Sequence, residues 1–249
     1  MNKIILLALF IFSSLNAGTI SIAVASNVSY AIEDLKREFN LLHPNTKVKV
    51  TLGSSGKLTA QIKHGAPYQL FMSANMLYPQ ALYEDNLTTT KPLIYAKGTL
   101  AYLSTKKMDF SNGIDILNSK EISNIAMANP KTAPYGKATL QAMKSANIYE
   151  NIKKKLVYGE SISQTLSYTI KATDIGIVAK SLLYSKRMKG YKKGINWMDV
   201  DTKLFSPISQ GIVILKDGSE NSEVEEFYKF IFSKKAKEIF KRFGYIVNE

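Results

Sequence analysis

Short apolar runs alternate with amphipathic stretches along most of the chain. Residues 19–25 are predicted to form a strand, and Val28, Leu35 and Phe39 then follow at helical spacing. The same succession recurs at 48–52 with 58–62, at 124–128 with 138–146, and at 156–158 with 166–170. Two further apolar runs, 69–73 and 175–178, are typical of buried parallel strands. The pattern predicts an α/β fold of mostly parallel sheets flanked by helices.

The middle and the end of the chain indicate two lobes. The extended run 93–103 is interrupted only by Gly98, and we interpret it as the crossing into a second lobe. Residues 209–215 are expected to return the chain, and the terminal helices, with Phe227 and Phe240 on their apolar faces, to close the first lobe's core. We therefore expect a first lobe of residues 18–95 plus 208–249, a second lobe of residues 96–207, and a hinge near 95–98 and 207–211.

Four strand-to-helix turns carry glycine, hydroxyl or amide residues. They lie at 26–27, 53–56, 129–136 and 159–163. In the second turn Ser54 and Ser55 stand at a helix start, where unpaired N–H groups and roughly half a positive charge favour an anion. A single turn of this kind is better explained by an ordinary serine N-cap. The recurrence favours a ligand site, because ligands in α/β folds bind beyond the carboxyl ends of strands.

The first seventeen residues have the pattern of a cleaved signal peptide. A short n-region containing Lys3 precedes the apolar run 4–12 and a small-residue segment ending at Ala17. A membrane anchor is the weaker interpretation, because this run is shorter than the roughly 20 residues that span a bilayer. The chain has no cysteine, which excludes disulfides, thiol catalysis and a lipid-modified N-terminal cysteine. We expect a soluble periplasmic protein without a lipid anchor.

The formal net charge of the chain is +13, and removal of residues 1–17 takes away a single positive charge, Lys3. A basic chain raises the question of a nucleic-acid partner. The lysines are spread along the chain, the denser runs such as 153–155 are short, and no nucleic-acid motif is found. A solvated basic surface that favours anions is therefore the better interpretation, and we expect no nucleic-acid partner.

Other residues with chemical potential are interpreted as structural. His43 and His64 are too isolated in the sequence to indicate a zinc site. Asp199 and Asp201 resemble a pair of acid-base carboxylates, but no nucleophile or cleft motif accompanies them, so we interpret them as loop charges. Trp197 is predicted to pack in an apolar setting rather than to stack on a ligand. Because no nucleophile-base pair or metal cluster is found, we do not expect an enzyme.

An ordered set of short motifs resembles a known family. The motifs are 25–27, 53–58, 65–67 with 70–74, 134–136, 176–178 and the ending 236–244. Together they resemble the periplasmic molybdate-binding proteins of molybdate ABC transporters, which belong to the type II periplasmic solute-binding proteins. The resemblance implies a two-lobe protein, with the ligand in the cleft between the lobes. It also implies a monomer without a cofactor that captures molybdate or tungstate for an inner-membrane permease and its ATPase.

The resemblance also implies the ligand positions. They correspond to Ser26, Asn27, Ser55, Tyr135 and Ile162, the last two through their backbone N–H groups. These residues would hold the oxyanion through its oxygens, with no direct ligation of the metal. One branch of the family has a tyrosine hydroxyl after the Gly-Ile-Val strand, and this chain has Ala179 there. That contact is therefore expected to be missing.

Neutral donors suit a fully deprotonated tetrahedral dianion. N–H and O–H groups at four helix starts would surround it without a cation. Phosphate retains protons near neutral pH and needs an acceptor such as a carboxylate. The nearby Glu160 is interpreted as an acid in the first turn of a helix. Two alternatives to a molybdate receptor stay open. One is a receptor of the same fold for another tetrahedral oxyanion, such as sulfate or chromate, and the other is an exported enzyme or adhesive basic protein. The sequence does not rank molybdate against tungstate.

Overall fold

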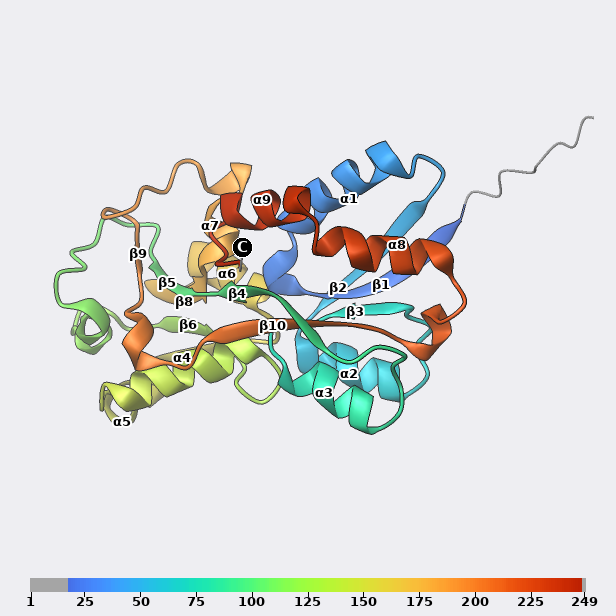
Figure 1. Cartoon of the computed structure of the whole chain (residues 1–249). Helices are drawn as coiled ribbons and strands as arrows, with labels where there is room; N and C mark the ends of the chain where they lie inside the picture. Colours follow the sequence, from blue (N-terminus) through green and yellow to red (C-terminus); the bar gives the residue numbers. More distant parts are fainter. Residues whose placement is uncertain (1–17, 248–249) are drawn as a thin grey trace, which may run out of the picture.

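The computed structural model describes residues 18–247, so the predicted signal peptide, residues 1–17, lies outside the described residues. Within this range the chain forms two five-stranded sheets, each flanked by helices, which make two lobes side by side. Figure 1 shows the first lobe around β1 to β3 and the second around β5 to β9. No helix in this range is long and apolar enough to cross a membrane.

The first lobe contains the sheet ordered β2-β1-β3-β10-β4. Its strands are β1 (Thr19–Ala25), β2 (Lys47–Gly53), β3 (Leu70–Met72), β4 (Leu93–Gly98) and β10 (Ile208–Ile214). Its helices are α1 (Ala31–Leu42), α2 (Ser55–Lys63), α3 (Leu77–Glu84), α8 (Ser222–Ile231) and α9 (Lys234–Arg242). Helices α1, α8 and α9 cover one face and α2 and α3 the other (Figure 1).

The second lobe contains the sheet ordered β7-β6-β8-β5-β9. Its strands are β5 (Leu100–Leu103), β6 (Ile125–Ala128), β7 (Leu156–Gly159), β8 (Ile175–Ala179) and β9 (Trp197–Asp199). Its helices are α4 (Pro134–Ser145), α5 (Tyr149–Ile152), α6 (Ile162–Lys171) and α7 (Lys180–Leu183). Short 3-10 helices lie at Ser26–Val28, Gly113–Asn118, Lys153–Lys155, Lys186–Met188, Thr202–Leu204 and Lys216–Gly218.

Both sheets are mixed. Strand β1 pairs in parallel with β2 and β3, and β6 pairs in parallel with β7 and β8. Strands β4, β5, β9 and β10 pair with their neighbouring strands antiparallel. The parallel character predicted from the sequence therefore belongs to the strands that alternate with helices. Of the strands next to the lobe crossings, β5 and β10 run opposite to the parallel strands, whereas β4 and β9 run in the same direction as them.

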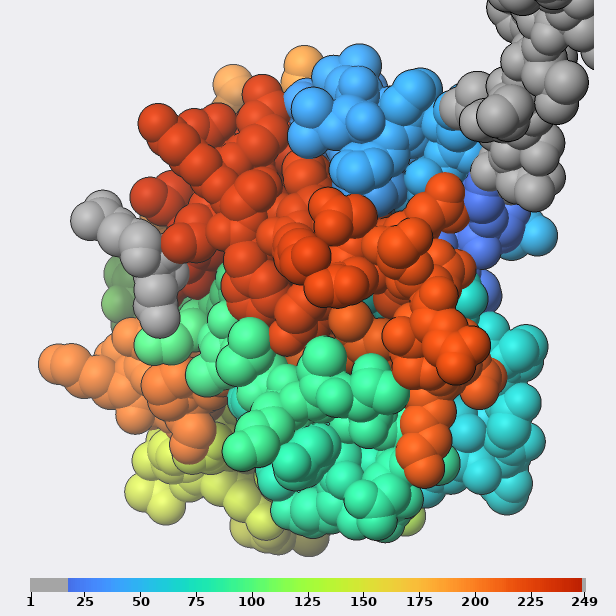
Figure 2. Space-filling model, turned by 45° about the vertical axis from the view of Figure 1, so that its right-hand side comes forward, coloured from blue at the N-terminus to red at the C-terminus, as the bar shows by residue number. Residues whose placement is uncertain are grey.

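The terminal helices complete the core of the first lobe, as the sequence predicted. Phe227 of α8 and Phe240 of α9 are fully buried, in the same core as Phe39 of α1. Figure 2 shows these C-terminal helices, in red, packed against α1, in blue. Helix α1 itself begins at Ala31, later than the predicted start near Val28, because Ser26–Val28 form a 3-10 turn. Val28 is nevertheless buried in this core.

The chain passes between the lobes at two places. Strands β4 and β5 are separated only by Thr99, yet they belong to different sheets. The run 93–103, which looks continuous in the sequence, is therefore broken next to Gly98. The chain returns between β9 and β10. Trp197 of β9 is buried in the core of the second lobe and donates its indole N–H to the Tyr191 carbonyl at 3.2 Å, so it is a packing residue, as predicted.

Candidate functional site

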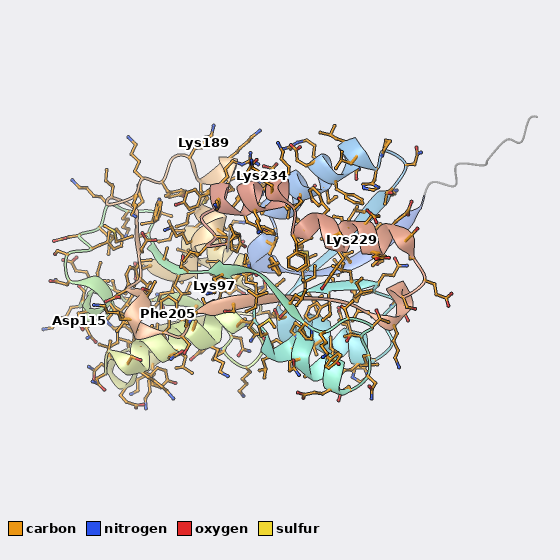
Figure 3. All side chains as sticks on the ribbon, in the orientation of Figure 1. Lys97, Asp115, Lys189, Phe205, Lys229 and Lys234 are labelled. Carbon is orange, nitrogen blue, oxygen red and sulfur yellow. The ribbon has the colours of Figure 1, made fainter. Side chains whose placement is uncertain are left out.

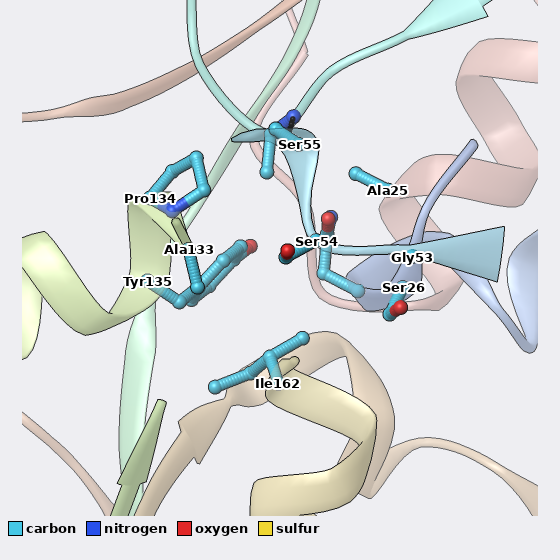
Figure 4. Close-up of a pocket in the computed structure, with 11 residues that line it drawn as sticks. Ala25, Ser26, Gly53, Ser54, Ser55, Ala133, Pro134, Tyr135 and Ile162 are labelled. Atoms are coloured by element: carbon cyan, nitrogen blue, oxygen red, sulfur yellow. Dashed lines mark hydrogen bonds between the residues drawn. The ribbon is translucent and has the colours of Figure 1, made fainter. Parts of the chain in front are cut away.

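A small pocket lies where helix starts from both lobes meet the ends of β1 and β2. It is lined by Ala25, Ser26, Asn27, Gly53, Ser54, Ser55, Ala74, Ala133, Pro134, Tyr135 and Ile162. In Figure 4, Ser55 lies above the centre, Pro134 and Tyr135 to the left, Ser26 to the lower right and Ile162 below. The structure thus brings all five predicted site residues together, although they are distant in the sequence.

The pocket is small and its wall is largely buried. Its empty volume is about 190 Å³, a figure that includes open solvent at its edge. Ser55 is fully buried, and Ser26 and Ile162 are 5% and 4% exposed. This size suits an ion of a few heavy atoms and excludes a peptide or an oligosaccharide.

Three helices direct backbone donors at this space. Helix α2 begins at Ser55, α6 begins at Ile162, and Tyr135 is the second residue of α4. The first N–H groups of a helix have no acceptor within the helix, and the helix dipole adds positive potential there. Pro134, at the first position of α4, has no N–H to offer, so the donor of that helix is Tyr135.

Ser55 has a defined hydrogen-bond role at the pocket wall. Its Oγ accepts a hydrogen bond from the backbone N–H of Ala74 at 2.9 Å. A hydroxyl that accepts through a lone pair still has its own proton to donate. Ser55 can therefore offer both its backbone N–H and its hydroxyl to an anion, which goes beyond the N-cap role of an ordinary serine.

Asn27 contributes to the wall in a different way from that expected. Its Nδ2 donates to Gln210 Oε1 and to the Tyr245 hydroxyl, both at 2.8 Å. In this arrangement both amide hydrogens are used away from the ligand space. The Asn27 Oδ1 atom is buried and has no hydrogen-bond partner among the described residues.

Tyr135 places a neutral phenol beside the site. The ring is 1% exposed, and its hydroxyl accepts a hydrogen bond from Gln210 Nε2 at 3.0 Å. Burial raises the pKa of Tyr135 well above its ordinary value, and the neighbouring Tyr245 raises it further. The hydroxyl therefore keeps its proton under physiological conditions. The sequence had indicated only the backbone N–H of this residue.

All eleven residues that line the pocket are uncharged. Glu160 lies just before α6, is largely exposed, and forms an ion pair with Lys57 across the two lobes at 3.2 Å. It lines a neighbouring surface hollow instead. Any anion in the enclosed pocket would thus be held by dipoles and hydrogen-bond donors, with neither a cation nor a carboxylate in contact.

Hydrogen bonds across the cleft show that the lobes are closed. The Gly56 N–H donates to the Thr132 carbonyl at 2.9 Å. Ser163 Oγ donates to the Ser26 carbonyl at 3.0 Å, and Ser181 Oγ donates to the Asn27 carbonyl at 2.9 Å. Each bond joins a residue of the first lobe to one of the second. The small volume of the pocket follows from this closure.

The predicted site residues did not include part of the pocket wall or the side chain that bonds Asn27 from outside the wall. Ala133 and Pro134 lie in a turn that the sequence did mark. Ala74 belongs to the motif 70–74 and Gln210 to the predicted hinge at 207–211, but neither was predicted as a site residue. Ala179, the position of the missing tyrosine, ends β8 and does not line the pocket.

The other residues with chemical potential show no site of their own. Within residues 18–247 there is no cluster of three histidine or acidic residues that could hold a metal ion. Asp199 pairs with Lys180 at 2.8 Å and also with Lys193, while Asp201 caps the 3-10 turn Thr202–Leu204. Asp201 is a loop charge, as interpreted, but Asp199 is not, because it ends strand β9 and its side chain is held by two lysines.

The fold and this interlobe pocket define a two-lobe solute receptor. A family model described as bacterial extracellular solute-binding protein matches residues 20–246, and the chain belongs to this family. It is 32% identical to the molybdate-binding protein ModA of Rhodobacter capsulatus over 234 residues, which are 92% of this chain and 89% of that protein. It is 31% identical to ModA of Azotobacter vinelandii, with 92% and 90% of the two chains covered.

A solved structure supports the same assignment. The periplasmic molybdate-binding protein of Azotobacter vinelandii superimposes with a TM-score of 0.84 at 28% identity, covering 92% of this chain and all of that one. The two-lobe α/β fold predicted from the sequence is therefore confirmed.

Proposed function

We propose that this protein captures molybdate, and also tungstate, in the periplasm and delivers it to the permease and ATPase of an ABC transporter. It would act as a monomer, without a cofactor and without catalysing a reaction. The membership in the solute-binding family and the similarity to two molybdate-binding proteins support the class of ligand. The proposed ligand positions are Ser26, Asn27, Ser55, Tyr135 and Ile162.

The observation that carries this proposal is an enclosed, uncharged pocket with helix starts from both lobes around it. A tetrahedral dianion needs donors on all sides, and N–H groups at helix starts provide them at fixed positions. With no carboxylate or histidine in the wall, the pocket lacks the acceptor that a protonated phosphate would need. Sulfate and chromate are also tetrahedral dianions, so a receptor for one of them is the second candidate.

The positive charge of the chain is not gathered at the pocket. Figure 3 shows Lys97, Lys189, Lys229 and Lys234 spread over different parts of the surface. Several lysines are paired with acids, including Lys229 with Glu225 at 2.8 Å. This distribution supports a general attraction of anions toward the protein rather than a nucleic-acid groove.

Competition calorimetry tests the proposal directly. The mature protein is titrated with molybdate, tungstate and sulfate, and each anion is then used to displace another. We expect tight binding of molybdate and tungstate with one site per chain, and much weaker binding of sulfate. Tighter binding of sulfate than of molybdate would support the second candidate, and no heat with any of the three would refute oxyanion capture.

Binding should be nearly independent of pH between about 6 and 9, because the proposed donors do not titrate there. Tyr135 is the one titratable residue in the wall, and its raised pKa keeps the hydroxyl neutral throughout this interval. The molybdate dissociation constant measured across this range provides the check. A slope of one proton per anion would mean that a titrating group enters the site.

Ligand binding should also close the two lobes. An anion that contacts donors of both lobes binds the closed state more tightly and increases its population. Small-angle scattering should therefore give a smaller radius of gyration with saturating molybdate than without it. The hinge is proposed near 95–98 and 207–211. An unchanged radius would show that the lobes are closed before the ligand arrives or do not move.

A further inference from the structure

Five buried polar side chains, two of them in the pocket wall and three outside it, connect the two lobes. This cluster, which we call the amide cluster, consists of Asn27, Tyr95, Tyr135, Gln210 and Tyr245. Each member is at most 4% exposed. Tyr135 belongs to the second lobe, and the other four belong to the first. Tyr95 is in β4 and Gln210 in β10, while Asn27 follows β1 and Tyr245 follows α9.

Gln210 is the centre of the amide cluster. Its Oε1 accepts from Asn27 Nδ2 at 2.8 Å and from the Tyr95 hydroxyl at 2.9 Å, and its Nε2 donates to the Tyr135 hydroxyl at 3.0 Å. Tyr245 accepts from Asn27 Nδ2 and donates to the Asn27 carbonyl. A Cβ atom at Gly98 would clash with the Tyr135 hydroxyl and come within 2.6 Å of Gln210 Nε2, so the hinge strand closes the cluster tightly.

This arrangement leaves an acceptor unpaired. Asn27 lines the pocket, its two amide hydrogens are bound behind it, and the buried Oδ1 has no partner. A buried acceptor without a partner is unfavourable, because it has lost its hydrogen bonds to water. Since Asn27 lines the pocket, an amide oxygen facing the ligand space would also repel an anion held there.

The same side-chain positions support a second arrangement. If the amides of Asn27 and Gln210 both turn by half a rotation, Gln210 Nε2 donates to Asn27 Oδ1 and to the Tyr95 hydroxyl. Tyr95 then donates to the Ser73 carbonyl, which lies 3.4 Å away. Tyr135 donates to Gln210 Oε1, and its raised pKa ensures that this proton is present. Tyr245 then donates to Asn27 Oδ1 in place of the Asn27 carbonyl, which keeps its hydrogen bond from Ser181 Oγ. The unpaired atom of Asn27 becomes the donor Nδ2.

The two arrangements are coupled because Gln210 contacts Asn27 through a single amide end. When Gln210 presents Oε1 it fixes Asn27 Nδ2 behind the pocket, and when it presents Nε2 it fixes Oδ1 there. An anion in the pocket favours the second arrangement, because only that arrangement offers it the Asn27 side chain as a donor. The cluster is thus a two-state element that a bound anion biases.

We propose that Gln210 is a positioning residue that sets the direction of the Asn27 amide, so that Nδ2 faces the bound oxyanion. This inference rests on the proposed function and adds a residue that does not contact the ligand. It also explains selectivity for a fully deprotonated anion. Nδ2 donates a hydrogen bond to a deprotonated oxygen of the anion. Oδ1 in the same place would instead accept a hydrogen bond from the protonated oxygen of hydrogen phosphate.

A double-mutant cycle measured with molybdate tests the coupling. We expect Gln210→Met to weaken binding by about tenfold and Asn27→Ala by more, while the double variant binds no more weakly than Asn27→Ala alone. Gln141→Met is the matched control, since Gln141 is exposed and its side-chain amide bonds Ser206. It should bind molybdate with the wild-type dissociation constant. Independent, multiplying effects of the two substitutions, or wild-type binding by Gln210→Met, would overturn the proposal.

Nuclear magnetic resonance of the wild-type protein provides a second test that does not depend on the folding of a variant. The side-chain amide signals of Asn27 are assigned by their absence in Asn27→Ala. Saturation with molybdate should move one of these proton signals downfield and slow its exchange with water. Signals that stay in place at saturation would refute the turn of the amide. If the wild type bound no molybdate or sulfate, the proposed function itself would fail, and this inference with it.

Discussion

Gly56→Val is expected to weaken molybdate binding by roughly 100-fold by preventing closure of the lobes. Gly56 lies in the first turn of α2, and its N–H donates to the Thr132 carbonyl of the other lobe at 2.9 Å. A Cβ atom there would come within 2.9 Å of that carbonyl oxygen and 2.7 Å of the Tyr78 hydroxyl. The carbonyl belongs to the main chain and cannot turn aside, so the valine side chain should keep the two lobes from closing fully.

The open form should tolerate this valine for two reasons. The clash with Thr132 arises only when the lobes meet, and the Tyr78 hydroxyl, which is in the same lobe as Gly56, is the end of a side chain that can turn away. Thermal unfolding without ligand should therefore change little, while the scattering change on adding molybdate disappears. Gly190→Val is the matched control, since no atom lies within 4 Å of a Cβ at that position. Wild-type affinity in Gly56→Val would mean that closure around Gly56 is not required for binding.

Ser55→Ala is the second substitution with a large expected effect. It removes a hydrogen bond to a charged ligand, which costs about 1–3 kcal/mol, or roughly five- to 150-fold in the dissociation constant. Calorimetry measures the change. The substitution also leaves the buried Ala74 N–H without its acceptor, so the thermal stability of the unliganded protein should fall as well.

Ser104→Ala separates these two effects. Ser104 is fully buried in the second lobe, donates to the Asp174 carbonyl at 2.7 Å and accepts from the Lys106 N–H at 3.2 Å. Its loss should lower stability by a similar amount but leave molybdate binding unchanged. If Ser55→Ala also bound molybdate normally, Ser55 would be only a structural serine at the start of α2.

Much of the fold could be predicted because its signals are local. The strand at 19–25 coincides with β1, and the apolar runs at 124–128 and 175–178 correspond to β6 and β8. Apolar periodicity reports which face of an element is buried, and turn residues report where it ends. The four turns that the sequence marked therefore contain most of the pocket wall, including Ser55 and Tyr135.

The sequence by itself determined the elements, the four turns and the uncharged residues that they offer to an anion. Only the tertiary structure decided what stands behind those turns. Gln210 and Tyr245 lie 183 and 218 residues from Asn27, and they bond its amide because β10 and the segment after α9 return to the end of β1. Closure likewise depends on Gly56 meeting Thr132 across the cleft. Local periodicity cannot show such contacts, because they arise from the pairing of strands and lobes that are distant along the chain.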